Sequence, residues 1–283
     1  MEKSGKGEKV ASELYRGIIF VLPLIYSIQT RFLRRSKLGI IIWATEYFIP
    51  VFLVMALIDL DSINIFYAIM LILSVYHLYE IGYIQNDCET IKRESSPTIR
   101  LTRHYLLFYE ENKNLIYILR VLIGIFFSWW IYSITGNSVL IISMWLVVPY
   151  FFVYNMIRGR INLYMLFFLM AYRYCFPLCV YCAIVSSDYM WTILVLMLFA
   201  YPFPTFIEIC ADGKGNPPEK WTLLFLKSFD ERFVFRIKYY SFMLVICIVL
   251  FLLLNTPYVT VILPLYFLLD RFPQLYMKKM GDK

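Results

Sequence analysis

Long runs of apolar residues, separated by short polar connections, dominate the pattern along this chain. A helix needs about 20 predominantly apolar residues to cross a bilayer, and eight runs approach or exceed that length. The pattern therefore predicts eight membrane-spanning helices, at 37–60, 63–84, 115–135, 138–157, 161–185, 188–210, 233–254 and 257–271.

A ninth apolar segment, 15–30, is short, carries Arg16 and Pro23, and has basic residues on both sides. These features favour an interfacial or re-entrant helix over a ninth span. The chain is 61% apolar and 17% charged, whereas an ordinary soluble domain has about 25% charged residues. We therefore expect one all-α, polytopic membrane domain of about eight or nine helices. Its parts are a cytoplasmic or interfacial segment at 1–36, the helix bundle at 37–271 and a cytoplasmic tail at 272–283.

The connections between the predicted spans alternate in charge. Those after the first, third, fifth and seventh spans read DLDS, TGNS, SSDY and NTP and contain no Lys or Arg, whereas all the others are basic. The positive-inside rule then places the basic connections and both termini in the cytoplasm. The net charge of +7 fits this topology and contact with anionic lipid, and no motif indicates a nucleic-acid partner. We expect an integral protein of the inner (cytoplasmic) membrane with its active face in the cytoplasm.

The second predicted span carries a polar face toward its cytoplasmic end. Helical spacing places four residues on this face: Tyr76, Glu80, Tyr83 and Asp87. The adjacent stripe holds Tyr79, Gly82 and Asn86. Further acidic and basic residues follow in the connection: Glu89, Lys92, Arg93, Glu94, Arg100 and Arg103.

The sixth predicted span ends with a second acidic group. Glu208 and Asp212 are spaced i, i+4, and Lys214 follows in a Gly- and Pro-rich connection. Carboxylates suit Mg²⁺, which also binds substrate phosphates, and basic side chains would hold the remaining phosphate charge. The alternative is that these residues only solvate the helix ends. Both acidic groups are predicted to emerge on the same side of the membrane, which favours a binding site.

Three charged residues fall inside predicted spans. Glu46, Arg120 and Arg173 should face the bundle interior or a water-filled cavity and find a partner there. Arg120 has the alternative of extending to the interface. Arg173 has two predicted partners, and the sequence does not choose between them: it could pair with Glu46 or contact a lipid phosphate. His77 and His104 have no nucleophile at a recognisable spacing, so we expect hydrogen-bonded neighbours rather than catalysts.

The residues at the end of the second span resemble the first motif of the UbiA superfamily of intramembrane prenyltransferases. The family pattern, NDxxDxxxD followed by a stretch with Arg and Pro, stands here as Asn86, Asp87 and Glu89, then Glu94 and SSPTIRL. Thr90 occupies the position of a family aspartate. The second motif follows the sixth helix, where this chain has Glu208 and Asp212. The decaprenyl-phosphate phosphoribosyltransferase branch is the nearer likeness, through SPTIR, through Ala211-Asp212 and through LKSFDERFVFRIKYY.

The resemblance implies a Mg²⁺-dependent transferase. Phosphoribosyl diphosphate would bind through the cation, and a polyprenyl phosphate would attack the anomeric carbon as diphosphate leaves, giving a lipid-linked sugar donor for surface glycans. The implied catalytic residues are Asp87, Glu89 and Asp212, with Glu94 as a further metal ligand. The implied substrate-binding residues are Tyr79, Asn86, Lys92, Arg93, Arg100, Arg103, Arg173, Glu208 and Lys214.

Two alternatives remain open from the sequence. The same fold could transfer a prenyl group from a prenyl diphosphate to an aromatic or lipid acceptor. The chain could instead be a catalytically silent membrane partner or a transporter, although a transporter would more naturally show broken helices near the midplane.

Overall fold

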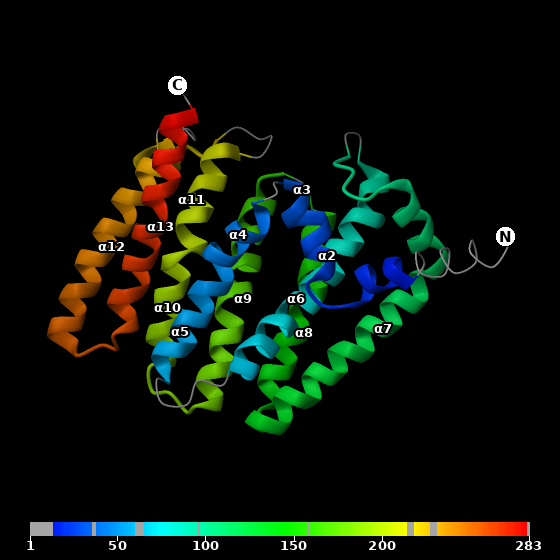
Figure 1. Ribbon diagram of the computed structural model, residues 1–283, viewed down its shortest axis with the longest axis horizontal. Helices are drawn as coiled ribbons and strands as arrows, with labels where there is room; N and C mark the ends of the chain where they lie inside the picture. The colour runs from blue at the N-terminus through cyan, green and yellow to red at the C-terminus, as the bar shows by residue number, and fades with distance from the viewer. Residues whose placement is uncertain are drawn as a thin grey trace, which may run out of the picture. The chain divides into compact units, whose positions relative to one another are not determined.

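The structure is a computed structural model of the whole chain (Figure 1). It describes residues 14–35, 38–59, 65–94, 97–157, 159–213, 218–226 and 231–281, with side chains as far as Gln274. These described residues form helices joined by turns, and no strand occurs among them. The predicted all-α class is therefore confirmed.

Within the described residues, seven helices are long and apolar enough to cross a membrane. Their bounds are Gly39–Ile58, Ile65–Arg93, Arg103–Thr135, Ser138–Met156, Ile161–Ile184, Met190–Asp212 and Arg232–Leu254. The last of these is the most exposed of the seven, as expected of a helix with a large surface against lipid. The helices indicate an integral membrane protein with a polytopic helical bundle.

The predicted eighth span, 257–271, is not among these seven. The residues belong to α13, which runs from Val259 to Gly281 and contains Pro264 and Pro273. Asp270 and Arg271 interrupt its apolar sequence. The predicted tail at 272–283 also begins as helix, because α13 continues to Gly281.

The segment predicted to be interfacial or re-entrant is a broken helix. One helix covers 14–21, and a second is built from α2 (Ile25–Ser27), the π-helical turn η1 (Ile28–Phe32) and α3 (Leu33–Arg35). Leu24 lies between them with φ of 71°, a left-handed conformation that ends one helix before the next begins. Neither half is long enough to cross a bilayer.

The sixth predicted span is also divided. It consists of α10 (Met190–Ala200) and α11 (Pro202–Asp212). Pro202 has no backbone N–H, and Tyr201 before it adopts φ of −134° and ψ of −54°, so the regular hydrogen-bond ladder is interrupted at this step.

The chain folds as two compact units. The first comprises Met1–Trp43 and Ile69–Met156, and the second comprises Ala44–Ala68 and Ile157–Lys283. The chain passes between the units at three points: between α4 (Gly39–Trp43) and the π-helical turn η2 (Ala44–Phe48), near the start of α6, and after Met156.

In the first unit, α6 (Ile65–Cys88) supplies the most buried helix, and α7 (Arg103–Thr135) packs beside α8 (Ser138–Met156). A buried apolar cluster joins the end of α6 to the 14–35 segment and to the start of α7. Its members are Ile19, Phe20, Tyr26, Ile84, Cys88, Leu101, Tyr109 and Ile116. This cluster fixes the N-terminal segment against the acidic end of α6.

In the second unit, α9 (Ile161–Ile184) packs against α10, α11 and α5 (Ile49–Ile58). Helices α12 (Arg232–Leu254) and α13 lie side by side (Figure 1), and α13 also contacts α5 and α10. The charged residues of η2, α11, α12 and α13 therefore all belong to this second unit.

Candidate functional site

The polar face of α6 is buried. Of the predicted face, Tyr76, Glu80 and Asp87 are each at most 1% exposed and Tyr83 is half-buried, and the neighbouring His77 is also buried. The face is therefore directed toward the interior of the first unit. Buried charges are costly unless they are paired and hydrogen-bonded, so the partners of these side chains indicate what the face does.

Glu80 and Arg120 form an ion pair across the break in the N-terminal helix. The Arg120 guanidinium donates to the Glu80 carboxylate at 3.0 Å and to the Phe20 carbonyl at 2.6 Å. The same carboxylate accepts the backbone N–H groups of Leu24 at 3.1 Å and Ser27 at 2.7 Å. The pair thus satisfies carbonyl and N–H groups that the break would leave without partners. Arg120 faces the interior and does not extend to the interface.

His77 supports the same arrangement. Its Nε2 lies 2.7 Å from the Arg120 carbonyl, and its own carbonyl accepts from the Arg120 guanidinium at 2.8 Å. This confirms the expected hydrogen-bonded neighbour. The other histidine, His104, is exposed near the start of α7.

Asp87 is the centre of a second network, at the end of α6. Its side chain is fully buried and accepts from Arg31 at 2.9 and 3.0 Å and from Arg100 at 3.0 Å. Tyr26 donates to it at 3.0 Å and Asn86 at 3.1 Å. Burial and the Asp87 charge raise the pKa of Tyr26 well above its ordinary value, so the phenol stays a donor.

Arg31 was not among the residues that the sequence pointed to. It lies in η1, 56 positions before Asp87 in sequence, and its guanidinium sits over the Tyr83 ring at 4.4 Å. The basic sequence RFLRRSK indicates the topology of the chain, and nothing near it in sequence points to Asp87. Of the two arginines that hold Asp87, only Arg100 was predicted.

Glu89 belongs to a separate network. It accepts from Tyr109 at 2.9 Å, from Lys113 at 2.6 Å and from Lys92 at 3.3 Å. Lys92 also pairs with Glu110 at 2.5 Å. Asp87 and Glu89 are thus engaged by different groups.

The remaining predicted residues of the first unit differ in exposure. Tyr79 is 2% exposed and packs edge-on against the rings of Tyr83 and Phe151, which makes it part of the helix packing. Arg93 ends the turn η3 (Thr90–Arg93), and half-buried Glu94 follows it. Arg103 is exposed at the first position of α7.

In the second unit, Glu208 of α11 is held by Arg236 of α12. The guanidinium contacts both carboxylate oxygens, at 2.5 and 2.9 Å. It also donates to the Thr205 hydroxyl at 2.7 Å and to the Tyr240 hydroxyl at 2.8 Å. Asp212 is the last residue of α11 and is exposed. Lys214 lies outside the described residues.

Glu46 has a different partner from the one considered in the sequence. It accepts from Arg271 of α13 at 2.9 Å and from the Tyr201 hydroxyl at 2.6 Å. The Arg173 guanidinium lies over the rings of Tyr47 and Tyr174, 5.3 and 5.4 Å from their centroids. The cation paired with Glu46 here is therefore Arg271 of α13, and a contact between Arg173 and a lipid phosphate stays a prediction.

The acidic side chains do not form a metal site from protein groups alone. Among the described residues, no group of three or more His, Cys, Asp or Glu side chains is placed to hold an ion. Mg²⁺, however, is usually bound through one or two carboxylates together with substrate phosphates. Asp87 would be the protein ligand in that second arrangement, and it would have to exchange one of its present contacts with Arg31, Arg100, Tyr26 or Asn86 for the ion.

The chain was also compared with known proteins. No protein-family model matches it, and neither the curated proteins nor the solved structures contain a match.

Proposed function

We propose that this chain is a UbiA-type intramembrane transferase that moves a phosphoribosyl group from phosphoribosyl diphosphate to a polyprenyl phosphate. The supporting observation is the Asp87 network. Asp87 is completely buried, yet the side chains of its two arginines are 18% and 30% exposed. A ligand that reaches these arginines meets two fixed cations with a carboxylate behind them.

The charges at this position suit a diphosphate. Arg31 and Arg100 contribute two positive charges and Asp87 one negative charge, so the group has an excess of one positive charge. Guanidinium groups bind phosphate oxygens in a bidentate manner. Bound Mg²⁺ would neutralise phosphate charge there, with Asp87 as its protein ligand.

The remaining chemistry needs positioning rather than a protein nucleophile. In the proposed reaction an oxygen of the lipid phosphate forms a bond to the anomeric carbon, the bond from that carbon to the diphosphate breaks, and diphosphate leaves with the electron pair. No proton transfer is required. Arg31 and Arg100 would hold the leaving diphosphate, and Tyr26 and Asn86 would keep Asp87 oriented.

Prenyl transfer from a prenyl diphosphate is the second candidate, because the same cations would hold the same leaving group. The phosphoribosyl donor is preferred since it carries an additional 5-phosphate, and exposed basic side chains such as Arg93 and Arg103 lie near the end of α6 in sequence. The preference depends on the number of cationic side chains available.

Transport receives less support from the two helix breaks. A transporter typically uses the freed backbone groups of broken helices to bind its substrate. Here the first break is satisfied by Glu80 and Arg120. At the second break, Tyr239 and Tyr240 donate to the carbonyls of Phe199 and Ala200, both at 2.8 Å. Protein side chains thus already engage these backbone groups.

The test is diphosphate release by the purified full-length protein in detergent with Mg²⁺. Reactions contain phosphoribosyl diphosphate and a short polyprenyl phosphate, either substrate alone, or a prenyl diphosphate with an aromatic acceptor. Release that needs both phosphoribosyl substrates supports the proposal. Release only from the prenyl diphosphate favours the second candidate, and release from neither contradicts both.

A further inference from the structure

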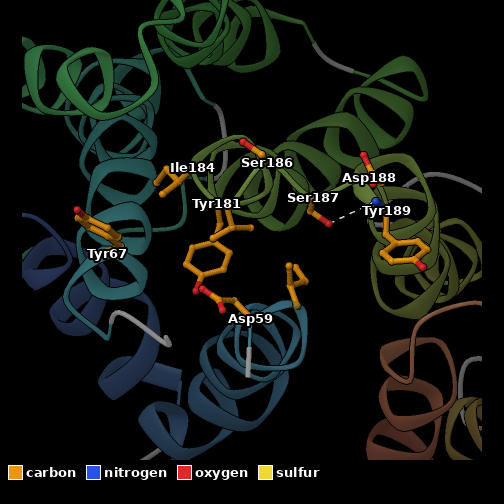
Figure 2. Close-up of a pocket in the computed structure, with 10 residues that line it drawn as sticks. Asp59, Tyr67, Tyr181, Ile184, Ser186, Ser187, Asp188 and Tyr189 are labelled. Atoms are coloured by element: carbon orange, nitrogen blue, oxygen red, sulfur yellow. Dashed lines mark hydrogen bonds between the residues drawn. The ribbon is translucent and has the colours of Figure 1, made fainter. Parts of the chain in front are cut away.

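A cavity of about 720 Å³ lies in the second unit, and none of the residues that line it belongs to a charged network described above. Residues at the end of α5, near the start of α6, and at the end of α9 with the turn after it line the cavity (Figure 2). The lining residues are Ile58, Asp59, Tyr67, Tyr181, Ile184, Val185, Ser186, Ser187, Asp188 and Tyr189. The proposed transferase site makes no use of them.

The charge of this lining has one sign. Asp59 and Asp188 are acidic, and no lining residue is Lys, Arg or His. The sequence extends this asymmetry, because neither 47–76 nor 174–213 contains a basic residue or histidine. A cavity with such a lining attracts cations and repels phosphate.

The lining also offers aromatic rings. Tyr67, Tyr181 and Tyr189 are three of the ten residues, and a cation gains energy over the face of a tyrosine ring. In Figure 2 the hydroxyl end of Tyr181 and the carboxylate of Asp59 point toward one another at the centre of the group, with Tyr67 and Tyr189 on opposite sides. Carboxylate and rings together suit an ammonium group with attached carbon better than a small metal ion.

The turn that forms one wall is fixed by backbone geometry. Ser186 adopts φ of 51°, and the Ser187 N–H bonds back to the Cys182 carbonyl at 2.9 Å, closing the C-terminus of α9. The Ser187 hydroxyl then accepts from the Tyr189 N–H at 3.3 Å. These bonds hold the wall in place without a ligand, so binding needs little ordering.

We propose that this cavity binds an organic ammonium group. Two sources share that chemistry. Because α5, α6 and α9 belong to candidate membrane spans and contribute their ends, the cavity is at a level where lipid headgroups lie, and the ammonium can belong to an aminophospholipid. It can equally belong to a free, soluble amine.

The probe for the test is choline, with 3,3-dimethylbutan-1-ol as a neutral compound of the same shape. Binding to the full chain in phosphatidylglycerol nanodiscs is measured by equilibrium dialysis. We expect saturable choline binding, no saturable binding of the alcohol, and a Kd at least tenfold higher in Asp59→Asn.

Asp188→Asn, at an exposed position in the turn, should weaken binding with little risk to folding. Glu111→Gln, in the first unit, is the control.

Three results would overturn the proposal. These are absence of saturable choline binding to the wild-type protein, equal binding of the neutral alcohol, and unchanged affinity in both aspartate variants. A repeat in phosphatidylethanolamine nanodiscs assigns the source, because competition by the lipid raises the apparent Kd for choline, whereas a site for soluble amines keeps it constant.

Discussion

The Arg120 guanidinium lies 3.0 Å from the Glu80 carboxylate, and both side chains are completely buried. The pair does more than neutralise two charges, since Arg120 binds the Phe20 carbonyl on one side of a helix break and Glu80 binds two N–H groups on the other. The broken helical segment 14–35 is thereby held in the interior of the first unit. That segment also carries Tyr26 and Arg31 to Asp87.

Removing one member of this pair should destabilise the protein strongly. Glu80→Gln leaves the Arg120 charge buried without a counter-charge. Arg120→Met leaves the Glu80 carboxylate buried without one. Each change should cost about 3–5 kcal/mol, seen as a large fall in the apparent melting temperature in detergent. The double variant should lose less than the sum of the two. Single variants that melt like the wild-type protein would contradict this account of the break.

Asp87→Asn should behave differently. Its arginine partners are partly exposed, so water can solvate them when the carboxylate charge is removed, and the melting temperature should change little. Diphosphate release should fall by at least ~10²-fold, as when a charge-stabilising group is lost from an active site. Glu111→Gln, at an exposed position of α7, is the matched control and should retain full activity. A variant that loses folding together with activity would make Asp87 structural.

The contact between α6 and α8 requires a glycine. A Cβ added at Gly82 would lie 2.2 Å from Cγ of Phe151, closer than any real contact. Gly82→Ala should therefore force the helices apart and cost about 1–3 kcal/mol. Phe151→Leu in the same chain should recover part of the loss. Gly17→Ala is the control, since its Cβ would lie 3.8 Å from the Phe108 ring, and it should be neutral or slightly stabilising. Equal melting temperatures for all variants would contradict the packing.

The sequence predicted the elements of this protein better than the partners of its charges. Apolar run lengths found the seven helices of spanning length, because that signal is local. Arg31 escaped notice because its partner is 56 positions away, and Glu46 was considered with Arg173 because no local signal leads to Arg271. The break at Tyr201–Pro202 did have a local signal, the two prolines of YPFPT, which a count of apolar residues ignores.

Substitutions of Arg236 test whether Glu208 has a structural role or binds substrate. Its side chain is 5% exposed and donates to Glu208, Thr205 and Tyr240 at once. A lysine keeps the charge but offers donors from a single point. Arg236→Lys should therefore lower the free energy of unfolding by about 2–3 kcal/mol, less than Arg236→Met, which leaves a nearly buried carboxylate unpaired.

Lys238→Arg on the exposed side of the same helix should leave both stability and activity unchanged. The decisive comparison is between the melting temperature and the rate of diphosphate release in Arg236→Lys. A fall in melting temperature with a rate per folded molecule close to wild type would show that the Glu208–Arg236 pair stabilises the packing of α11 against α12. An unchanged melting temperature with a lower rate would instead show that the second acidic motif contacts substrate, as the resemblance to the prenyltransferases implies.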